Sequence, residues 1–502
     1  MENNLKSRID WFITLVPFTC ILLLCILFIA FPEGSAAVLD AVRGFLGDDM
    51  GIFYLIIGLG MVTVSLYMAF SRYGNIRLGG DAPQYSYFKW GSMMFTAGLA
   101  ADILFYSLCE WMLYANEDYL KNFGTVQDWA PTFPLFHWGP IPWSFYMVLA
   151  VAFGFMIHVR KCSKQKYSEA CRPVLGKSTD GWAGRIIDLI AVFALIAGTA
   201  TTFSLATPLL SLSICEVFGI GQSAALTVIL LIAICVVYTI CALKGIKGVS
   251  WLAASCTYLC LALLAFVLLF GGQARYILET GLTAIGNLAQ NFIGLATRTD
   301  PLRLTSFPQN WTIFYWAYWM VWCVATPFFI GSISKGRTVR QVILGGYIFG
   351  LAGTFTSFII LGNYGLSLQM HGSLDILGFY EKCGDLYQSI IAIINTLPAS
   401  KMVLILLAVT MVAFYATSFD SISMVAASYS YRNLLPDEEP DKKLRFVWSI
   451  LLILLPVALI FSESSMNNLQ TVSIIAAFPI GIIMILMIVS FFKDADSYLS
   501  GK

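Results

Sequence analysis

Long apolar stretches recur along the whole sequence, and they limit the possible folds more than any other feature. A helix needs about 20 mostly apolar residues to cross a lipid bilayer. The 502 residues are 58% hydrophobic and only 12% charged, too few charged residues to cover a soluble protein of this length. The sequence therefore predicts an all-α integral membrane protein with one large membrane domain. The formal net charge of +1 argues against a basic nucleic-acid-binding protein, so no nucleic-acid partner is expected.

Twelve stretches are expected to span the membrane. They lie near residues 11–31, 51–70, 92–115, 142–159, 186–214, 223–243, 250–272, 309–331, 339–364, 401–430, 446–463 and 470–492. The first is too long for the core of a typical signal peptide, and further stretches follow it at once. Residues 273–297 are poorer in apolar residues and carry Arg275 and Glu279, so this segment is expected to lie along the membrane surface.

The Lys and Arg residues indicate which side of the membrane each loop faces. Cytoplasmic loops of membrane proteins carry the excess of basic residues. This predicts cytoplasmic N- and C-termini and supports twelve spans. With that orientation, only seven of the 30 Lys and Arg residues lie in external segments, namely Arg43, Lys121, Arg275, Arg298, Arg303, Lys382 and Lys401.

Cysteine and histidine are not arranged as ligands or catalytic groups. Most of the 12 cysteines lie in apolar stretches and none forms a CxxC pair, so they are expected to be small buried side chains. The three histidines, His137, His158 and His371, do not form a cluster. An intramembrane metalloenzyme or acyltransferase would need clustered histidines, so no enzyme, metal site or cofactor is expected.

Three acidic residues fall inside expected spans, where an ionisable group is costly and by default marks function. Glu110 is interpreted as a structural residue near the outer end of the third span, and Asp420 as a capping or network residue in the tenth. Asp102 lies near the middle of the third span with no basic residue close to it in the sequence. An unpaired carboxylate there must be protonated or face a cation, so Asp102 is a candidate functional residue.

Residues 311–322, WTIFYWAYWMVW, contain seven aromatic residues. On a helix, Trp311, Tyr315, Tyr318, Trp319 and Trp322 share one face. A belt of rings at the membrane surface would explain Trp311 and Tyr315. It does not explain Trp319 and Trp322, which lie about 12–16 Å further along the helix axis.

An aromatic cage for a quaternary ammonium group explains these deeper rings. Such a group cannot donate hydrogen bonds, but it is attracted to the faces of aromatic rings. A second aromatic cluster, FPLFHWGPIPWSFYMV at 133–148, contributes Trp138, Trp143 and Tyr146. Together the two clusters predict a cation-binding site at membrane depth.

These segments resemble the betaine/choline/carnitine transporter (BCCT) family, and the resemblance covers nearly the whole chain. The family signature is a small polar residue, Trp-Thr, an aliphatic residue, any residue, an aromatic residue, Trp, any residue and Trp-Trp. Residues 310–319, NWTIFYWAYW, match it except that Tyr318 stands where Trp is usual. FHWGPIPW (136–143), SISKGRTVR (332–340) and RYGNIRLG (72–79) are similar to the start of the family's fourth helix, the loop after its eighth helix and its second loop.

The resemblance implies a LeuT-like fold of two inverted five-helix repeats, helices 3–7 and 8–12, preceded by two further helices. It divides the chain into residues 1–91, 92–272, 273–308, 309–492 and 493–502. It also implies a homotrimer in the bilayer and a substrate site halfway across the membrane. Trp311 would lie in the outer vestibule. The residues implied to contact substrate are Trp138, Trp143, Tyr146, Tyr315, Tyr318, Trp319, Trp322 and Asp102.

The resemblance leaves the coupling ion open. Sodium-coupled members bind a cation between the third helix and a Thr-Ser pair in the tenth, matched here by Thr417 and Ser418, with Phe414 one turn earlier. Ion-independent carnitine exchangers instead carry Arg and Met near the cation positions, where this chain has Ser250 and Thr326.

The third helix also departs from the family pattern. The usual Gly-x-Gly-x-Gly bend is replaced by GLAAD at 98–102. The loss of two glycines stiffens the backbone, so the depth of the break is left open. The Asp102 that ends this segment is similar to the aspartate of proton-coupled choline carriers, so it is the candidate coupling residue for H⁺. With Phe414, Thr417 and Ser418 as candidates for Na⁺, these four are the candidate coupling residues.

The expected function is uptake of choline, carnitine or betaine across the plasma membrane by a cation-coupled secondary transporter. Ion-independent exchange of carnitine with γ-butyrobetaine, or of betaine, is the alternative. A sensor with an inherited fold and an enzyme acting on choline-like head groups are disfavoured. The sequence shows no output domain in its short tails and no nucleophile motif.

Overall fold

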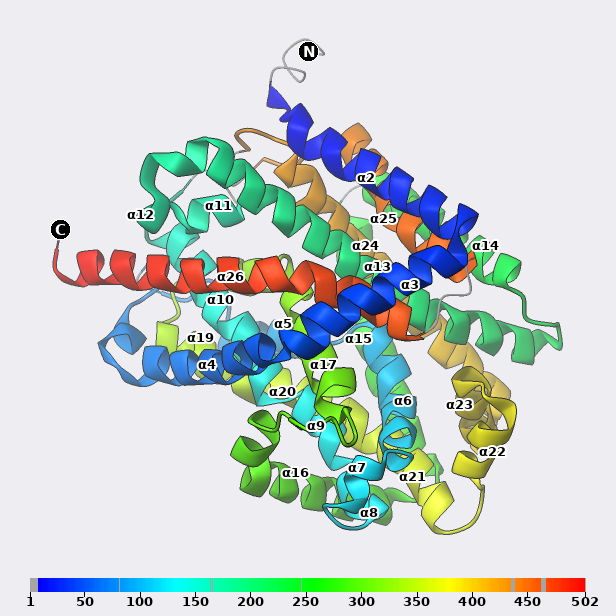
Figure 1. Cartoon of the computed structure of the whole chain (residues 1–502). Helices are drawn as coiled ribbons and strands as arrows, with labels where there is room; N and C mark the ends of the chain where they lie inside the picture. Colours follow the sequence, from blue (N-terminus) through cyan, green and yellow to red (C-terminus); the bar gives the residue numbers. More distant parts are fainter. Residues whose placement is uncertain are drawn as a thin grey trace.

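The computed structural model describes residues 8–501 apart from 81, 163, 165, 245, 435–437 and 462–465, and it describes no side chains in 237–254 or at 420, 461 and 467. Over that part the chain is helical, and its β-structure is limited to two isolated bridges, Ile9 with Tyr431 and Arg77 with Thr338 (Figure 1). The expectation of an all-α fold is therefore confirmed for the described residues.

The helices of the first half follow one another with short connections. They are α2 (Trp11–Ala30), α3 (Pro32–Arg43), α4 (Gly51–Phe70), α5 (Tyr87–Ala97), α6 (Ala101–Ala115), α7 (Asp118–Lys121), α8 (Val126–Trp129), α9 (Thr132–His137), α10 (Pro140–His158), α11 (Tyr167–Ala170), α12 (Arg172–Leu175), α13 (Trp182–Phe218) and α14 (Ala224–Lys244).

The second half contains long helices as well as short ones that are joined by π-helical turns. They are α15 (Ile246–Phe270), α16 (Ala274–Ala296), η4 (Pro308–Thr312), α17 (Ile313–Trp322), α18 (Thr326–Ile333), α19 (Val339–Gly345), η5 (Gly346–Gly350), α20 (Leu351–Ser357), η6 (Phe358–Gly362), α21 (Asn363–Met370), α22 (Ile376–Cys383), α23 (Leu386–Asn395), α24 (Ser400–Tyr429), α25 (Lys442–Phe461) and α26 (Met466–Leu499). Segments α19 to α21 run on without a gap.

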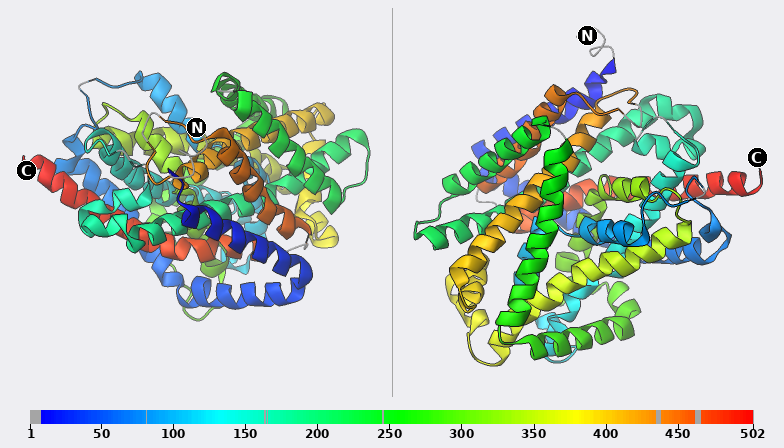
Figure 2. Two further views of the ribbon diagram at one scale, coloured as in Figure 1. Left: turned by 90° about the horizontal axis from the view of Figure 1, so that it is seen from above. Right: turned by 180° about the vertical axis from the view of Figure 1, so that it is seen from behind.

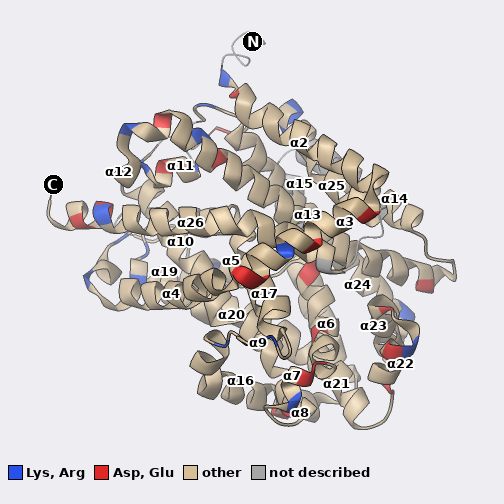
Figure 3. Ribbon diagram, in the orientation of Figure 1, with Lys and Arg blue, Asp and Glu red and all other residues tan. Residues whose placement is uncertain are grey.

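Eight helices of the described residues are long and apolar enough to cross a membrane, or up to eleven if each of three bent pairs counts as one span. The sixth expected span corresponds to α14, which is described with side chains only as far as Val236. These spans fit an integral membrane protein, and the exact number of twelve stays a prediction. Figure 3 shows most charged residues at helix ends and in loops, as a bilayer requires.

Two of the bent pairs are the helices that begin the two expected repeats. The chain turns by 61° between α5 and α6 and by 54° between α17 and α18. A break near the start of each half is the pattern that inverted repeats predict. The repeats themselves stay a prediction.

Helix α16 turns away from the bundle. It bends by 113° from the preceding helix and runs across the end of the bundle (Figure 2). Its buried residues recur at three- and four-residue steps on one face, including Ile277, Gly281, Ala284 and Leu288. This amphipathic helix suits the surface position expected for residues 273–297.

The centre of the bundle is formed by the long helices of both halves. Helix α13 packs against α24 and α26, α17 packs against α26, and α10 packs against α18. The outer helices keep an apolar exposed face instead; in α2, Leu23, Ile26 and Ile29 are all more than half exposed. In a membrane protein such a face contacts lipid or another subunit.

Candidate functional site

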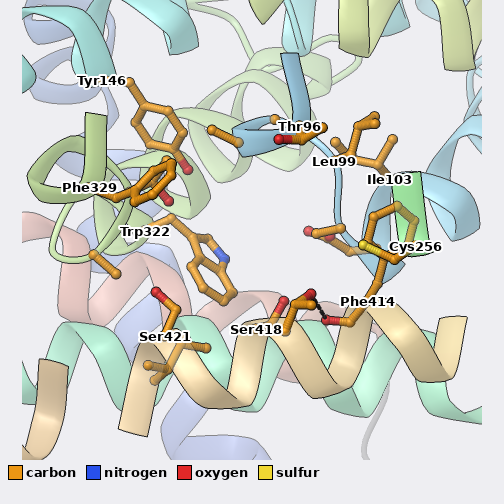
Figure 4. Close-up of a pocket in the computed structure, with 18 of the residues that line it drawn as sticks. Thr96, Leu99, Ile103, Tyr146, Cys256, Trp322, Phe329, Phe414, Ser418 and Ser421 are labelled. Carbon is orange, nitrogen blue, oxygen red and sulfur yellow. Dashed lines mark hydrogen bonds between the residues drawn. The ribbon is translucent and has the colours of Figure 1, made fainter. Parts of the chain in front are cut away.

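A cavity of about 410 Å³ lies where the two broken helix pairs meet α24. Its walls come from the α5–α6 break, from α17 and α18, from α24 and from Cys256 and Thr257 of α15. Figure 4 shows Tyr146, Phe329 and Trp322 on one side of the cavity, and Ile103, Cys256 and Phe414 on the other. A cavity of this volume is in the range that holds a small organic ligand.

Five of the eight residues expected to contact substrate are aromatic side chains that line this cavity: Trp138, Tyr146, Tyr318, Trp319 and Trp322. The Trp319 ring is central, with centroid distances of 4.8 Å to Tyr146 and 5.6 Å to Trp138. The indole N–H groups of Trp319 and Trp322 are buried and have no hydrogen-bond partner among the described residues. Because both residues line the cavity, these N–H groups are available to water or to a polar atom of a ligand there.

Two expected contact residues, Trp143 and Tyr315, do not line the cavity but support the rings that do. Trp143 packs against Tyr146 and Trp319, with ring centroids 5.7 and 6.0 Å away. Tyr315 lies 5.6 Å from the Trp138 ring and stacks on His137 at 4.8 Å.

Trp311, expected in the outer vestibule, also lies away from the cavity. Its Nε1 donates a hydrogen bond to Glu117 at 2.7 Å. Burial raises the pKa of Glu117, against the opposing effect of this hydrogen bond. Trp311 packs edge-on against Tyr114, near the end of α6.

The backbone opens at residues 98–100, immediately before Asp102. Helix α5 ends at Ala97, Ala100 is extended, and α6 begins at Ala101. Gly98 has a negative φ that any residue can adopt, so its backbone conformation does not require glycine. Packing does require it, because a Cβ there would lie 2.5 Å from Cζ2 of Trp143. The break therefore forms without the two missing glycines, because Ala100 adopts an extended conformation that any residue can reach.

Asp102 is buried in the first turn of α6 and lines the cavity. Its Oδ2 accepts a hydrogen bond from Tyr318, whose hydroxyl is also bonded to that of Thr202 on α13. Its Oδ1 is buried without a hydrogen-bond partner, and no ion pair joins Asp102 to a described basic residue. The N-terminal end of a helix favours a negative charge. Tyr318, at the position where the family has Trp, thus holds one oxygen and leaves the other open.

The cation-coupling candidates lie on α24, whose Phe414 is on the same side of the cavity as Ile103 of α6 (Figure 4). Phe414, Thr417 and Ser418 all line the cavity. The Thr417 hydroxyl donates to the Phe414 carbonyl at 2.9 Å, which leaves oxygen lone pairs available (Figure 4). Hydroxyl and carbonyl oxygens are ligands that a hard cation such as Na⁺ accepts. The side chains of Ser250 and Asp420 lie outside the described residues, whereas Thr326 lines the cavity.

One end of the cavity is exposed and the other is covered. Phe329 and Met424 are 41% and 38% exposed, whereas Trp138 and Trp319 are 2% and 3% exposed. The exposed end belongs to the ends of α18 and α24 that the expected topology places in the cytoplasm. Trp138, Tyr315 and His137 form the cover on the other side.

Thr202 is a site residue that the sequence reasoning missed. Residues 198–207, GTATTFSLAT, form a run of small and hydroxyl-bearing residues inside an otherwise apolar span. In a membrane helix such a run marks close packing or hydrogen bonding to a neighbouring helix. This run is therefore the sequence feature from which Thr202 could have been found.

Comparison with known proteins agrees with the cavity's composition. The profile of the BCCT family, described as betaine/carnitine/choline family transporters, matches residues 12–499. A probable glycine betaine transporter of Desulfitobacterium hafniense is 30% identical over 477 residues, 93% of each chain. A carnitine transporter of Acinetobacter baumannii is 26% identical over 425 residues, covering 84% of this chain and 76% of the relative.

A third relative, the uncharacterized transporter YeaV of Escherichia coli, is 26% identical over 450 residues, 88% of this chain and 91% of its own. The family and the relatives are transporters and not enzymes, as the sequence predicted. With the cavity at its two helix breaks, this chain belongs to the betaine/carnitine/choline (BCCT) family of multi-pass membrane transporters, whose substrates are small quaternary ammonium compounds.

Proposed function

We propose that this chain is a plasma-membrane secondary transporter that takes up a trimethylammonium compound by alternating access, coupled to a cation gradient. The observation that carries the proposal is the cavity in which Trp138, Tyr146, Trp319 and Trp322 surround the space beside the open oxygen of Asp102. Aromatic faces attract a quaternary ammonium group, and the attraction is strongest where water is excluded.

The charge of the site favours a cationic substrate over a zwitterionic one. Asp102 brings a negative charge, and the described residues place no Lys or Arg on the cavity wall. Choline carries no carboxylate, so an ionised Asp102 balances its charge. Carnitine and betaine carry a carboxylate that an ionised Asp102 repels, and protonation of Asp102 removes that conflict. Choline is the leading substrate, with carnitine and betaine next.

Two sites in the cavity suit a coupling ion. Asp102 can carry H⁺, and the oxygens of Phe414, Thr417 and Ser418, which line the same cavity, can bind Na⁺. Both lie on the lining, so an ion at either site would interact with the substrate directly. The proposal is cation coupling, and the choice between H⁺ and Na⁺ is an outcome of the experiment below.

Alternating access is supported by the asymmetry of the cavity. In the expected orientation, with both termini in the cytoplasm, the exposed end faces the cytoplasm and the aromatic cover faces outward. The breaks between α5 and α6 and between α17 and α18 provide hinges at the depth of the cavity. We also propose a homotrimer, on the family resemblance; the mass of the detergent-solubilised protein tests it.

Uptake into proteoliposomes tests the function. Labelled choline, carnitine and glycine betaine are each offered with no gradient, a sodium gradient, a proton gradient, or unlabelled substrate inside. Accumulation driven by one ion gradient is the expected result. Uptake that occurs only with substrate inside would instead establish the exchanger, and no uptake of any of the three would refute the function.

A further inference from the structure

Glu110 lies outside the cavity but is bonded to one of its walls. It is on α6, about two turns beyond Asp102, and is fully buried. Its Oε2 accepts a hydrogen bond from Nε1 of Trp138 at 2.7 Å, and its Oε1 accepts one from the Tyr114 hydroxyl. A carboxyl group with no part in the proposed site is therefore one hydrogen bond from the aromatic cage.

No described Lys or Arg forms an ion pair with Glu110. The nearest basic group is His137, whose Nδ1 lies 3.7 Å from Oε1 and whose side chain is also fully buried. A buried carboxyl group with no fixed cation binds or releases a proton according to its hydrogen bonds and nearby charge. The titratable groups that face it are Tyr106, Cys109 and Tyr114 on α6, His137 on α9 and Tyr315 on α17.

A continuous hydrogen-bonded chain leads away from Glu110. The Tyr114 hydroxyl lies 2.6 Å from Nδ1 of His137, and Nε2 of His137 lies 3.0 Å from Oγ1 of Thr312 in η4. When Glu110 is ionised, Tyr114 donates to it, His137 donates from Nδ1 to Tyr114, and Thr312 donates to Nε2. When Glu110 is protonated, every donor in the chain reverses. Both arrangements satisfy all the groups, and they differ by one proton.

We propose that Glu110 is a proton-binding site that opposes the substrate cation. It is ionised when a trimethylammonium group occupies the cavity and protonated when the cavity is empty. An ionised carboxylate makes the stronger hydrogen bond to the Trp138 N–H and makes the ring face more negative toward a bound cation. By linkage, a cation that favours the ionised form is itself bound less tightly when the proton is present. This site rests on the proposed function.

Release of the proton follows the hydrogen-bonded chain. Glu110 gives its proton to Tyr114, Tyr114 gives its own to Nδ1 of His137, and His137 gives its Nε2 proton to Thr312, whose hydroxyl proton leaves. Each member ends with the donor it needs for the ionised arrangement, and one proton leaves per bound cation. Thr312 is buried beside Trp311 and does not line the cavity, so its hydroxyl proton passes to water only when the covered side opens.

Infrared difference spectra on addition of choline test this directly. Loss of a carboxylic acid appears as a negative band in the C=O stretching region. Because Asp102 on the cavity wall can also lose a proton when choline binds, the comparison is made without it. We expect the band in Asp102→Asn and not in the double variant Asp102→Asn/Glu110→Gln. The matched control is Glu117→Gln. Glu117 also accepts a Trp N–H, from Trp311 at 2.7 Å, but it is half-buried and does not line the cavity, so the band should persist.

Binding measured against pH gives a second readout. One linked proton changes the choline Kd by up to about tenfold per pH unit, with weaker binding as pH falls. In the Asp102→Asn background this slope should disappear on adding Glu110→Gln. If Glu110→Gln does not fold, Tyr114→Phe removes a hydroxyl bonded to the acid and must shift the infrared band.

The results that would overturn the site are specific. They are a band that survives in Asp102→Asn/Glu110→Gln, a band absent from Asp102→Asn while choline binds, or an unshifted band when Tyr114→Phe is added to Asp102→Asn. Calorimetry run in parallel separates the two proposals. No binding of choline, carnitine or betaine would overturn the proposed function and this site with it. Binding of choline to Asp102→Asn without a negative carboxylic acid band would overturn this site alone.

Discussion

Replacing Trp319 by leucine removes the ring at the centre of the proposed cage. The Trp319 ring lines the cavity, is 3% exposed, and lies between Tyr146 and Trp138 at 4.8 and 5.6 Å. Its N–H has no partner among the described residues, so no hydrogen bond is lost with it. The ring's role in binding is therefore separable from any role in a polar network.

The expected loss of affinity follows from the burial of the Trp319 ring, where water is excluded. A cation on a buried aromatic face gains about 2 kcal/mol. Each 1.4 kcal/mol corresponds to about tenfold in Kd. Trp319→Leu should therefore weaken binding of the trimethylammonium ligand by about 30-fold. Leucine is large enough to limit collapse of the cavity, so we expect a stability loss of about 1–3 kcal/mol.

Trp316→Leu is the matched control on the same helix. Trp316 is fully buried and, like Trp319, has an N–H without a partner among the described residues. It packs against Phe136 with ring centroids 5.2 Å apart and does not line the cavity. The Trp316→Leu variant should lose stability to a similar extent, while its Kd for choline should be unchanged.

Isothermal titration calorimetry of choline, with thermal unfolding of both variants, separates binding from folding. Trp319→Phe, which keeps a ring, should fall between the wild type and Trp319→Leu. A Kd for folded Trp319→Leu within about threefold of the wild type would refute the cage. So would an equal loss of affinity in Trp316→Leu.

Three further perturbations address other parts of the site. Tyr318→Phe removes the donor to Asp102, a bond to a charged group worth about 1.5–3 kcal/mol. It should weaken choline binding by about 10- to 100-fold and betaine binding less; an unchanged ratio of the two Kd values would argue against pairing of Asp102 with the choline cation. A thiol reagent carrying a trimethylammonium group should modify Cys256 on the cavity wall, and choline should slow the reaction by mass spectrometry; equal rates with and without choline would place the ligand elsewhere. Gly98→Ala places a Cβ 2.5 Å from an indole of α10 and should lower the melting temperature and raise the Kd, whereas Gly60→Ala, whose Cβ meets nothing within 4 Å, should do neither.

The helical membrane class could be predicted because each apolar run extends over a whole helix. The expected span at 51–70 coincides with α4, and the segment 273–297 forms the single amphipathic helix α16. The breaks could not be placed in the same way. The α5–α6 break depends on how Trp143 packs against Gly98, a contact between residues 45 positions apart that periodicity does not show.

The candidate site was predicted in part for the same reason. Aromatic residues at helical spacing bring Trp319 and Trp322 to one face, and they do line the cavity. Spacing could not separate these from Tyr315, which is on that face but turns to stack on His137. The bond between Tyr318 and Thr202 joins two helices 116 residues apart, so it emerged only from the fold.

The most direct measurement of the central claim compares choline with its neutral isostere, 3,3-dimethyl-1-butanol, in which carbon replaces the ammonium nitrogen. The two ligands have nearly the same shape, so the ratio of their Kd values isolates the positive charge recognised by the aromatic rings and Asp102. The account predicts that choline binds at least about 30-fold more tightly, from a cation–π contribution of about 2 kcal/mol. Equal affinities would show that the cavity recognises shape alone and would contradict it.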